Sequence, residues 1–189
     1  MAGGMHADQD GGRAGRFRDL ALPLLDDVYT LARYLLGSAA DADDAVQECY
    51  LRAYRHFDTY RGPHIKPWMF AILRNVCHSA RARSAAAPQP AGSMADDADE
   101  AAIPVWSEPA ETPEIAVLRR HDSDTIQRLV AALPLPFREV IVLREIDDLS
   151  YREIADVVGA PVGTVMSRLA RARALLRQAW LAADGKEQP

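Results

Sequence analysis

Residues 149–173 read LSYREIADVVGAPVGTVMSRLARAR, and this stretch decides the fold of the second half of the chain. Ser150 and Glu153 form a capping box, in which a hydroxyl and a carboxylate satisfy free backbone amides at the start of a helix. That short helix ends at Gly159, and a tight turn leads into a last helix that runs to about Ala182. Two short helices joined by a turn that contains glycine predict a helix-turn-helix, whose second helix can lie in the major groove of DNA.

The last helix carries its polar and basic side chains on one side. Val165, Leu169 and Leu176 recur at helical spacing, so we expect them to face inward. Arginine can bond a guanine edge bidentately or hold a phosphate, and small hydroxyls can reach either. Because the helix has four arginines and no acid from residue 157 to 183, we favour DNA binding over a merely solvated helix face. The outward set is Thr164, Ser167, Arg168, Arg171 and Arg173.

The net charge of −5 is distributed unevenly along the chain. Residues 85–114 hold seven acids and no lysine or arginine, so the rest of the chain carries +2. Segment 85–113 is rich in alanine, proline and acids and has no sustained apolar period, which predicts a flexible acidic linker. Its one apolar cluster surrounds Trp106. The overall acidity therefore does not count against nucleic-acid binding.

Both sides of the linker are predicted to be all-α, because no stretch alternates with the period of two that half-buried strands show. Apolar residues at helical spacing predict one helix over about 16–36. Aspartates suited to a helix dipole start a second helix near residues 40–44, which runs to about 57. A third helix is predicted over about 67–83. After the linker, helices are expected over about 114–132 and 137–145.

The composition offers no site for an enzyme or a metal. Cys49 and Cys77 have no metal-ligand spacing, so we expect both to be ordinary packing residues. No paired catalytic carboxylates and no phosphate-binding loop are found, and no cofactor is expected. No apolar run is long enough to cross a bilayer and the N-terminus has no signal core, so a cytoplasmic protein without membrane insertion is expected.

Three motifs of the second half resemble region 4 of the extracytoplasmic-function (ECF) sigma factors, a group of the sigma-70 family. They are residues 149–155 (LSYREIA), 161–165 (PVGTV) and the arginine-rich 167–173 (SRLARAR). The first half independently resembles region 2 of the same family, through residues 41–48 (DADDAVQE), 51–54 (LRAY) and 57–62 (FDTYRG), continued by Trp68 and 72–75. The pairing of both motifs, in this order and on either side of a linker, is far more specific than a helix-turn-helix alone.

The resemblance implies a transcription-initiation subunit rather than an enzyme, with core RNA polymerase and promoter DNA as partners. Its polymerase contacts would be the clamp helices of the largest subunit and the flap region, and an anti-sigma factor would regulate it. In the family, the start of the second helix docks on the clamp helices, which implies the surface Asp44, Gln47 and Glu48. Simple capping of the helix dipole is the alternative for these acids.

The resemblance also implies two DNA contacts. The loop before the third helix would capture a base from the melted minus-10 element, because an aromatic ring can stack on a base while cations hold the backbone. Its minus-10 residues are Tyr60, Arg61, His64, Lys66, Arg74 and Asn75. The minus-35 residues are Thr164, Met166, Ser167, Arg168, Arg171 and Arg173, with Met166 at a position where many family members have a basic residue.

The expected organisation has five parts. They are a disordered N-terminus (1–15), a region 2 domain (16–84), the acidic linker (85–113), a region 4 domain (114–183) and a tail (184–189). The main rival is a repressor or response-regulator output domain built on the same helix-turn-helix. Such a protein would bind duplex DNA alone, and it would leave the motifs of the first half without a use.

Overall fold

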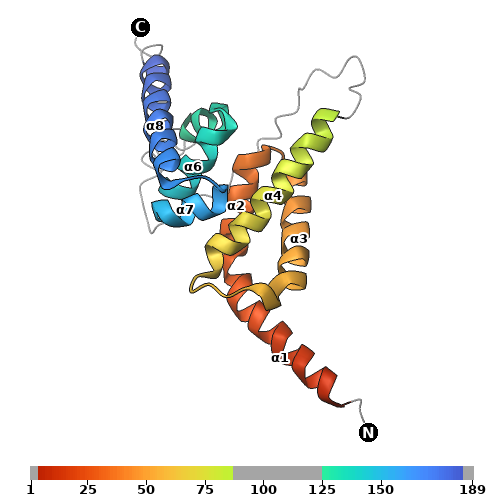
Figure 1. Ribbon diagram of the computed structural model, residues 1–189. Coiled ribbons are helices and arrows are strands. Elements are labelled where there is room, and N and C mark those ends of the chain that lie inside the picture. Colours follow the sequence, from red (N-terminus) through yellow and green to blue (C-terminus); the bar gives the residue numbers. More distant parts are fainter. Residues whose placement is uncertain (1–3, 87–124, 185–189) are drawn as a thin grey trace, which may run out of the picture.

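The computed structural model describes residues 4–86 and 125–184, whose regular elements are all helices (Figure 1). The first half comprises α1 (Gly4–Ala21), η1 (Leu22–Leu24), α2 (Leu25–Leu36), α3 (Ala39–His56), η2 (Phe57–Thr59) and α4 (Ile65–Ala86). The second half comprises a helix at 125–132, α6 (Leu135–Glu145), α7 (Tyr151–Val158) and α8 (Val162–Asp184). The predicted all-α architecture is confirmed. Residues 87–113 of the expected linker, with Trp106, lie outside the described residues, as do 114–124.

Helices α2, α3 and α4 pack against one another and form the body of the first half. The helix α3 begins after Ser38, whose Oγ accepts a hydrogen bond from the Asp41 N–H at 3.3 Å and so satisfies one of the free amides of the first turn. Burial of apolar side chains on these three helices and on η2 stabilises this body. The fully buried ones include Val28, Leu31, Leu35, Cys49, Phe57, Met69, Phe70 and Leu73.

The N-terminal part of the chain corrects two predictions. Helix α1 begins at Gly4, inside the segment 1–15 that was expected to be disordered. It is anchored because the Arg13 guanidinium donates to the Tyr54 carbonyl at 2.6 Å and lies 3.3 Å from an Asp58 carboxylate oxygen. The single helix predicted over 16–36 is broken at η1, where Pro23 lacks the backbone N–H that a continuous helix requires.

The predicted helix-turn-helix is confirmed in α7 and α8. At the start of α7 the Ser150 Oγ accepts from the Glu153 N–H, and the Glu153 carboxylate accepts from the Ser150 N–H at 2.9 Å. Gly159 ends the helix in the left-handed conformation, with φ 64°, which glycine adopts without steric cost. Just before α7, Asp148 also has a positive φ of 57°, a conformation that a short polar side chain tolerates.

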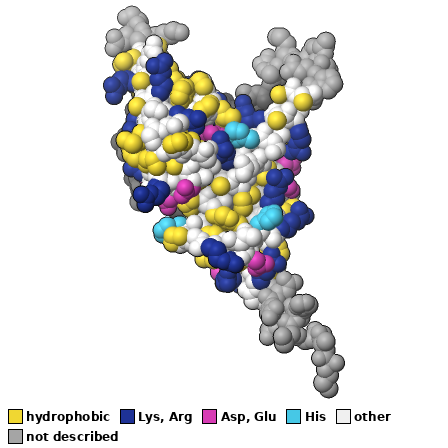
Figure 2. Space-filling view, viewed as in Figure 1, with side chains coloured by type: hydrophobic (Ala, Val, Ile, Leu, Met, Phe, Trp, Pro, Cys, Tyr) yellow, Lys and Arg dark blue, Asp and Glu magenta, His cyan; other side chains and the backbone are white. Residues whose placement is uncertain are grey.

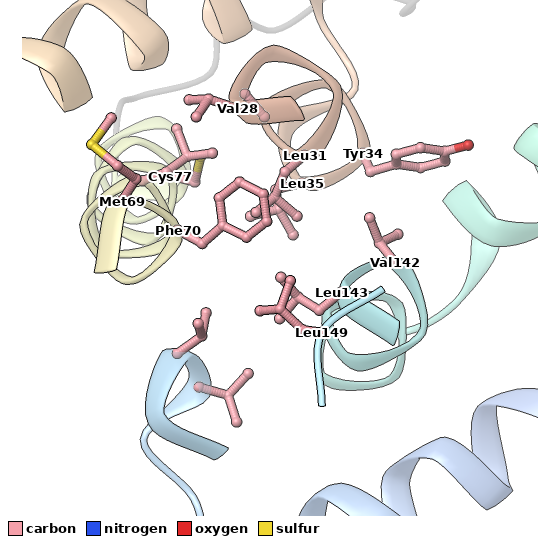
Figure 3. Packing of buried hydrophobic residues seen from close by; sticks show 14 of the residues in the cluster. Val28, Leu31, Tyr34, Leu35, Met69, Phe70, Cys77, Val142, Leu143 and Leu149 are labelled. Atoms are coloured by element: carbon pink, nitrogen blue, oxygen red, sulfur yellow. The ribbon is translucent and has the colours of Figure 1, made fainter. Parts of the chain in front are cut away.

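The two halves pack directly against each other. Helix α6 contacts α2 as well as α7 and α8, and α4 contacts α7. In the space-filling view of Figure 2 their surfaces meet below a notch between the far ends of α4 and α8. Figure 3 shows Leu35 and Phe70 of the first half pointing toward Leu143 and Leu149 of the second. One apolar cluster therefore runs through both halves.

Candidate nucleic-acid interface

Tyr60 lies in the loop between η2 and α4, within a row of aromatic rings. Its ring stacks on that of the buried Phe57 with 6.2 Å between centroids and 12° between planes, and the Trp68 ring lies 5.4 Å away. A Cβ on Gly62 would lie 3.3 Å from the Tyr60 ring, so glycine lets the loop fold closely over the aromatic side chain. The result is a half-buried aromatic platform at the surface, of the kind on which an unpaired base can stack.

A pocket of about 390 Å³ opens beside this platform. Tyr60, Arg61 and His64 line it together, so the structure gathers three of the predicted minus-10 residues around one hollow. Burial raises the pKa of the Tyr60 hydroxyl above its ordinary value. The far wall of the pocket comes from the second half, which contributes two carboxylates of α7, Glu153 and Asp156.

Lys66 and Arg74, two more of the predicted minus-10 residues, are paired with acids. The Lys66 Nζ lies 3.0 Å from an Asp27 carboxylate oxygen and 3.6 Å from Asp147 of the second half. The Arg74 Nε donates to the carboxylate of Glu139, which belongs to α6, at 3.1 Å. These cations are therefore already engaged, whereas Asn75, the last predicted member, is exposed on α4.

The predicted polymerase-docking residues Asp44, Gln47 and Glu48 line one groove of about 670 Å³ between α3 and α4. Asp44 and Gln47 are exposed, and the Glu48 carboxylate accepts from the Arg52 Nε at 2.5 Å, one turn further along α3. The structure thus brings the three together on one surface. The groove offers both charge and depth to a partner.

Leu51 is a residue of this groove that the sequence reasoning missed. It is 53% exposed, which is unusual for a leucine of a well-packed helix, and it lines the groove with Val76 of α4. Its position seven residues after Asp44 and four after Gln47 places it on the same face of α3, and that spacing could have revealed it. The α4 wall could not be foreseen, because it depends on how two helices pack.

The predicted minus-35 residues lie on α8. Its inner face buries Val165, Leu169 and Ala172, which fixes the opposite face toward solvent. Along the outer face, Met166, Ser167, Arg171 and Arg173 are exposed, whereas Thr164 and Arg168 are half-buried. The Ser167 hydroxyl donates to the Thr164 carbonyl at 2.9 Å, and its oxygen remains free to accept.

Arg173 differs from the other arginines of this face because it has a carboxylate partner. Its guanidinium donates to a Glu145 carboxylate oxygen, with the shorter contact at 2.6 Å, and this hydrogen bond raises the pKa of the arginine. Both side chains are about half exposed, so the pair is a surface ion pair of small energy. Arg171 makes no ion pair within the described residues.

Both cysteines are buried and free, one on α3 and one on α4. Burial raises the pKa of Cys49 and of Cys77 to about 12, so neither thiol is ionised near neutral pH. The expectation that they are packing residues is confirmed. Within the described residues no cluster of metal-ligating side chains is found, and no helix there is long and apolar enough to cross a membrane.

Comparison with known proteins identifies both halves. The family model described as Sigma-70 region 2 matches residues 20–86, and the model described as Sigma-70, region 4 matches residues 123–176. The ECF RNA polymerase sigma factor SigW of Bacillus subtilis is 33% identical over 167 residues, which covers 86% of this chain and 87% of that protein. The ECF RNA polymerase sigma-E factor of Escherichia coli K12 is 32% identical over 160 residues, with 84% and 79% covered.

Two solved structures share the fold. The sigma factor RpoE from Bartonella quintana, in complex with the anti-sigma factor NepR, aligns with a TM-score of 0.66 at 24% identity and covers 87% of this chain and 96% of its own. CnrH, in complex with the cytosolic domain of CnrY, aligns with a TM-score of 0.62 at 26% identity and covers 94% and 95%. With regions 2 and 4 in order and relatives that match over most of their length, the chain belongs to the extracytoplasmic-function sigma factors of the sigma-70 family.

Proposed function

We propose that this sigma factor directs core RNA polymerase to its promoters through two separate DNA contacts, one in each half. The observation that carries this proposal is the pairing of an aromatic pocket around Tyr60 with an exposed, basic α8 face around Arg171. An aromatic platform suits an unpaired base, and a helix with outward arginines suits the major groove of a duplex. A promoter that is melted at one element and double-stranded at the other requires both.

The minus-10 contact is assigned to the loop and to α4. Tyr60 stacks on the extruded base, Arg61 and His64 line its pocket, and Lys66, Arg74 and Asn75 follow the strand along α4. The minus-35 contact is assigned to the outer face of α8. Ser167, Arg171 and Arg173 are its leading base contacts, with Thr164 and Met166 beside them and Arg168 toward the phosphates.

The groove of Asp44, Gln47 and Glu48 is proposed as the surface that docks on the clamp helices of the largest polymerase subunit. Exposed carboxylates and an amide suit basic residues of a partner, and the exposed Leu51 adds apolar area to the groove. The region 4 half is assigned to the flap region. The chain would then act in the cytoplasm as a binding subunit, with no reaction of its own.

An anti-sigma factor is proposed as the regulator of this chain. The two structural neighbours were solved in complex with the anti-sigma factor NepR and with the cytosolic domain of CnrY. The domain limits proposed above, 16–84 and 114–183, leave the acidic segment 85–113 between the two DNA contacts. Copurification of a protein that blocks initiation, from the native host, would identify the regulator.

Run-off transcription with core polymerase on a promoter library tests the proposed function. Wild type should give initiation at promoters with defined minus-10 and minus-35 elements, and Arg171→Ala should relax the preference at one minus-35 position. Loss of a bidentate base contact costs about 1–3 kcal/mol. Arg177→Ala, an exposed arginine further along α8, is the matched control and should leave base preference unchanged. Absence of core-dependent initiation, together with binding of duplex DNA by the chain alone, would favour the repressor alternative.

A further inference from the structure

The Tyr60 ring depends on Phe57 for its orientation. It lies nearly parallel to the Phe57 ring, with 12° between the two planes and 6.2 Å between centroids. The backbone of the loop also turns back on this residue, because the Tyr60 N–H donates to the Phe57 carbonyl at 3.1 Å. Phe57 is fully buried, so the part of the molecule that holds Phe57 also sets the platform on which a base would stack.

Phe17 of α1 holds the Phe57 ring from a second direction. The two rings meet edge to face, with 5.2 Å between centroids and 78° between planes. Phe17 makes the same kind of contact with Tyr54 at 5.3 Å and with Tyr50 at 6.3 Å. Edge-to-face contacts are directional, because the positive edge of one ring points at the negative face of another. One buried side chain of α1 therefore fixes the ring on which Tyr60 is stacked.

Arg13 of α1 ties down the backbone at the end of α3. Its guanidinium donates to the Tyr54 carbonyl at 2.6 Å and to the Arg55 carbonyl at 3.3 Å, in the last turn of that helix. Cations are favoured there because the helix dipole makes the C-terminal end negative. The guanidinium also lies 3.3 Å from a carboxylate oxygen of Asp58, which belongs to η2. In Figure 1, α1 leaves the body of the first half close to this end of α3.

The contacts from α1 converge on one short segment. Arg13, Arg16 and Phe17 recur at spacings of three and four, so they share one face of the helix. The Arg16 guanidinium lies over the Phe57 ring, 5.1 Å from its centroid. An apolar face would also bury Phe57, but directional hydrogen bonds fix the course of the backbone as well. The residues of the described chain that line the Tyr60 pocket include none of the three, so any effect of this face on a base is indirect.

We propose that α1 is a positioning element of the minus-10 contact, in which Phe17 and Arg13 hold the segment 54–58 and thereby orient the Tyr60 ring for a base. This inference rests on the proposed stacking of a base on Tyr60. Both α1 residues precede residue 20, where the match to region 2 begins, so the family model does not cover them. Their effect should be confined to the one base that Tyr60 stacks, whereas binding of a minus-35 duplex by α8 should be unchanged.

The test measures how much one base contributes to binding, with the full chain assembled on core polymerase. Single-stranded minus-10 oligonucleotides, each with one position made abasic, are compared with the intact strand by fluorescence anisotropy. Tyr60→Ala identifies the stacked position, because removal of that base should weaken wild-type binding roughly tenfold and should not weaken binding of this variant. A general loss of protein stability does not alter this ratio, so the readout is specific to base stacking.

Phe17→Leu and Arg13→Ala are the two test variants of α1. The first keeps an apolar side chain but loses the aromatic edge, and the second keeps the aromatic cluster but releases the end of α3. In each, removal of the stacked base should weaken binding by no more than roughly threefold. Phe17→Tyr keeps the ring and should keep the wild-type ratio.

Two matched controls should also keep the wild-type ratio. Val28→Ala truncates a fully buried residue of α2 and so lowers stability in the same half. Arg18→Ala removes an exposed arginine of α1. A lowered ratio in Val28→Ala would overturn the inference, because the effect would then come from loss of stability alone.

The inference is also overturned if Phe17→Leu and Arg13→Ala both keep the wild-type ratio, since α1 would then only pack against the first half. Arg13→Ala decides the question if Phe17→Leu does not fold, which circular dichroism would show. Failure of the proposed function has a different signature. No abasic position would then distinguish Tyr60→Ala from wild type, and the positioning role would fail with it.

Discussion

The two surfaces proposed to bind DNA differ in how available they are. The outer face of α8 is open to solvent, and Ser167 and Arg171 stand on it without an acid partner within the described residues. On α4, by contrast, two cations are already engaged: Lys66 lies near Asp27 of its own half and Asp147 of the other half, and Arg74 binds Glu139 of the other half. The proposed duplex contact is thus open to solvent, whereas two cations of the proposed single-strand contact are paired with carboxylates.

This difference suggests an order of events at a promoter. A duplex minus-35 element can meet the exposed α8 face without any rearrangement, whereas the minus-10 strand can reach α4 only after the halves part. Single-stranded DNA binding by a free sigma factor would be non-productive, and coupling it to an opening step restricts it to the polymerase complex.

Leu143→Ala should have the largest effect, because it destabilises the contact between α6 and the first half. The side chain is 1% exposed and lies where α6 meets the first half, so its truncation leaves a cavity at the junction. We expect a loss of about 3 kcal/mol in the free energy of unfolding, measured by urea denaturation. Leu181→Ala, at a leucine of α8 that is 62% exposed, should change it by less than about 0.5 kcal/mol. Equal effects of the two substitutions would contradict the burial of α6.

The contact between the two halves should become less stable as pH rises. Burial raises the pKa of Asp147 from 3.8 to about 7, which the nearby Lys66 only partly offsets and which Asp27 and Asp148 reinforce. The closed chain therefore holds a proton between these two pKa values that an open chain releases, so stability of the closed state falls through this window. The radius of gyration should increase across it in wild type. Asp147→Asn should remove the dependence, and an identical titration in that variant would refute the assignment.

Ser150→Ala should destabilise α7, the helix that precedes the exposed α8 in the helix-turn-helix. It removes the hydroxyl that caps α7 and loses the hydrogen bond that lowers the pKa of Glu153. We expect a cost of about 1 kcal/mol in stability, seen by thermal melting, and weaker binding of a minus-35 duplex. Ser84→Ala, at an exposed serine near the end of α4, is the control and should not destabilise the chain.

Glu145→Gln should have the smallest effect, a modest increase in affinity for a minus-35 duplex. It releases Arg173 from a half-exposed ion pair, so the arginine becomes available to DNA. Because such pairs contribute about 0–1 kcal/mol, the affinity for a minus-35 duplex should rise by no more than about fivefold. Fluorescence anisotropy with a labelled duplex would measure it. A loss of affinity would show that Glu145 positions Arg173 for DNA rather than restraining it.

The helix-turn-helix could be predicted from the sequence because its signals are local. The capping box of Ser150 and Glu153 and the left-handed Gly159 depend on residues a few positions apart, and the structure has both. The start of α3 was predicted near the aspartates, but Ser38 is its cap. The interruption at Pro23 was available from the sequence, since proline inside a helical pattern is a known breaker.

The covered state of α4 could not be predicted, because its causes are distant in sequence. Arg74 and Glu139 are 65 positions apart, and no pattern within either half indicates that they meet. The same holds for Arg13, whose contact with Tyr54 orders a helix in the segment expected to be disordered. The run Val140 to Leu143 did carry a signal, since four successive apolar residues of a helix point in different directions and must be buried on several sides.

The most direct test of this contrast compares two DNA probes on the same full chain, with and without core polymerase. Anisotropy would follow a duplex that carries the minus-35 element and a single strand that carries the minus-10 element. We predict that the free chain binds the duplex but not the strand, and that core polymerase confers binding of the strand. Equal affinity of the free wild-type chain and of a Glu139→Gln variant, which lacks the carboxylate that binds Arg74, for the strand would contradict the coverage of α4 by the second half.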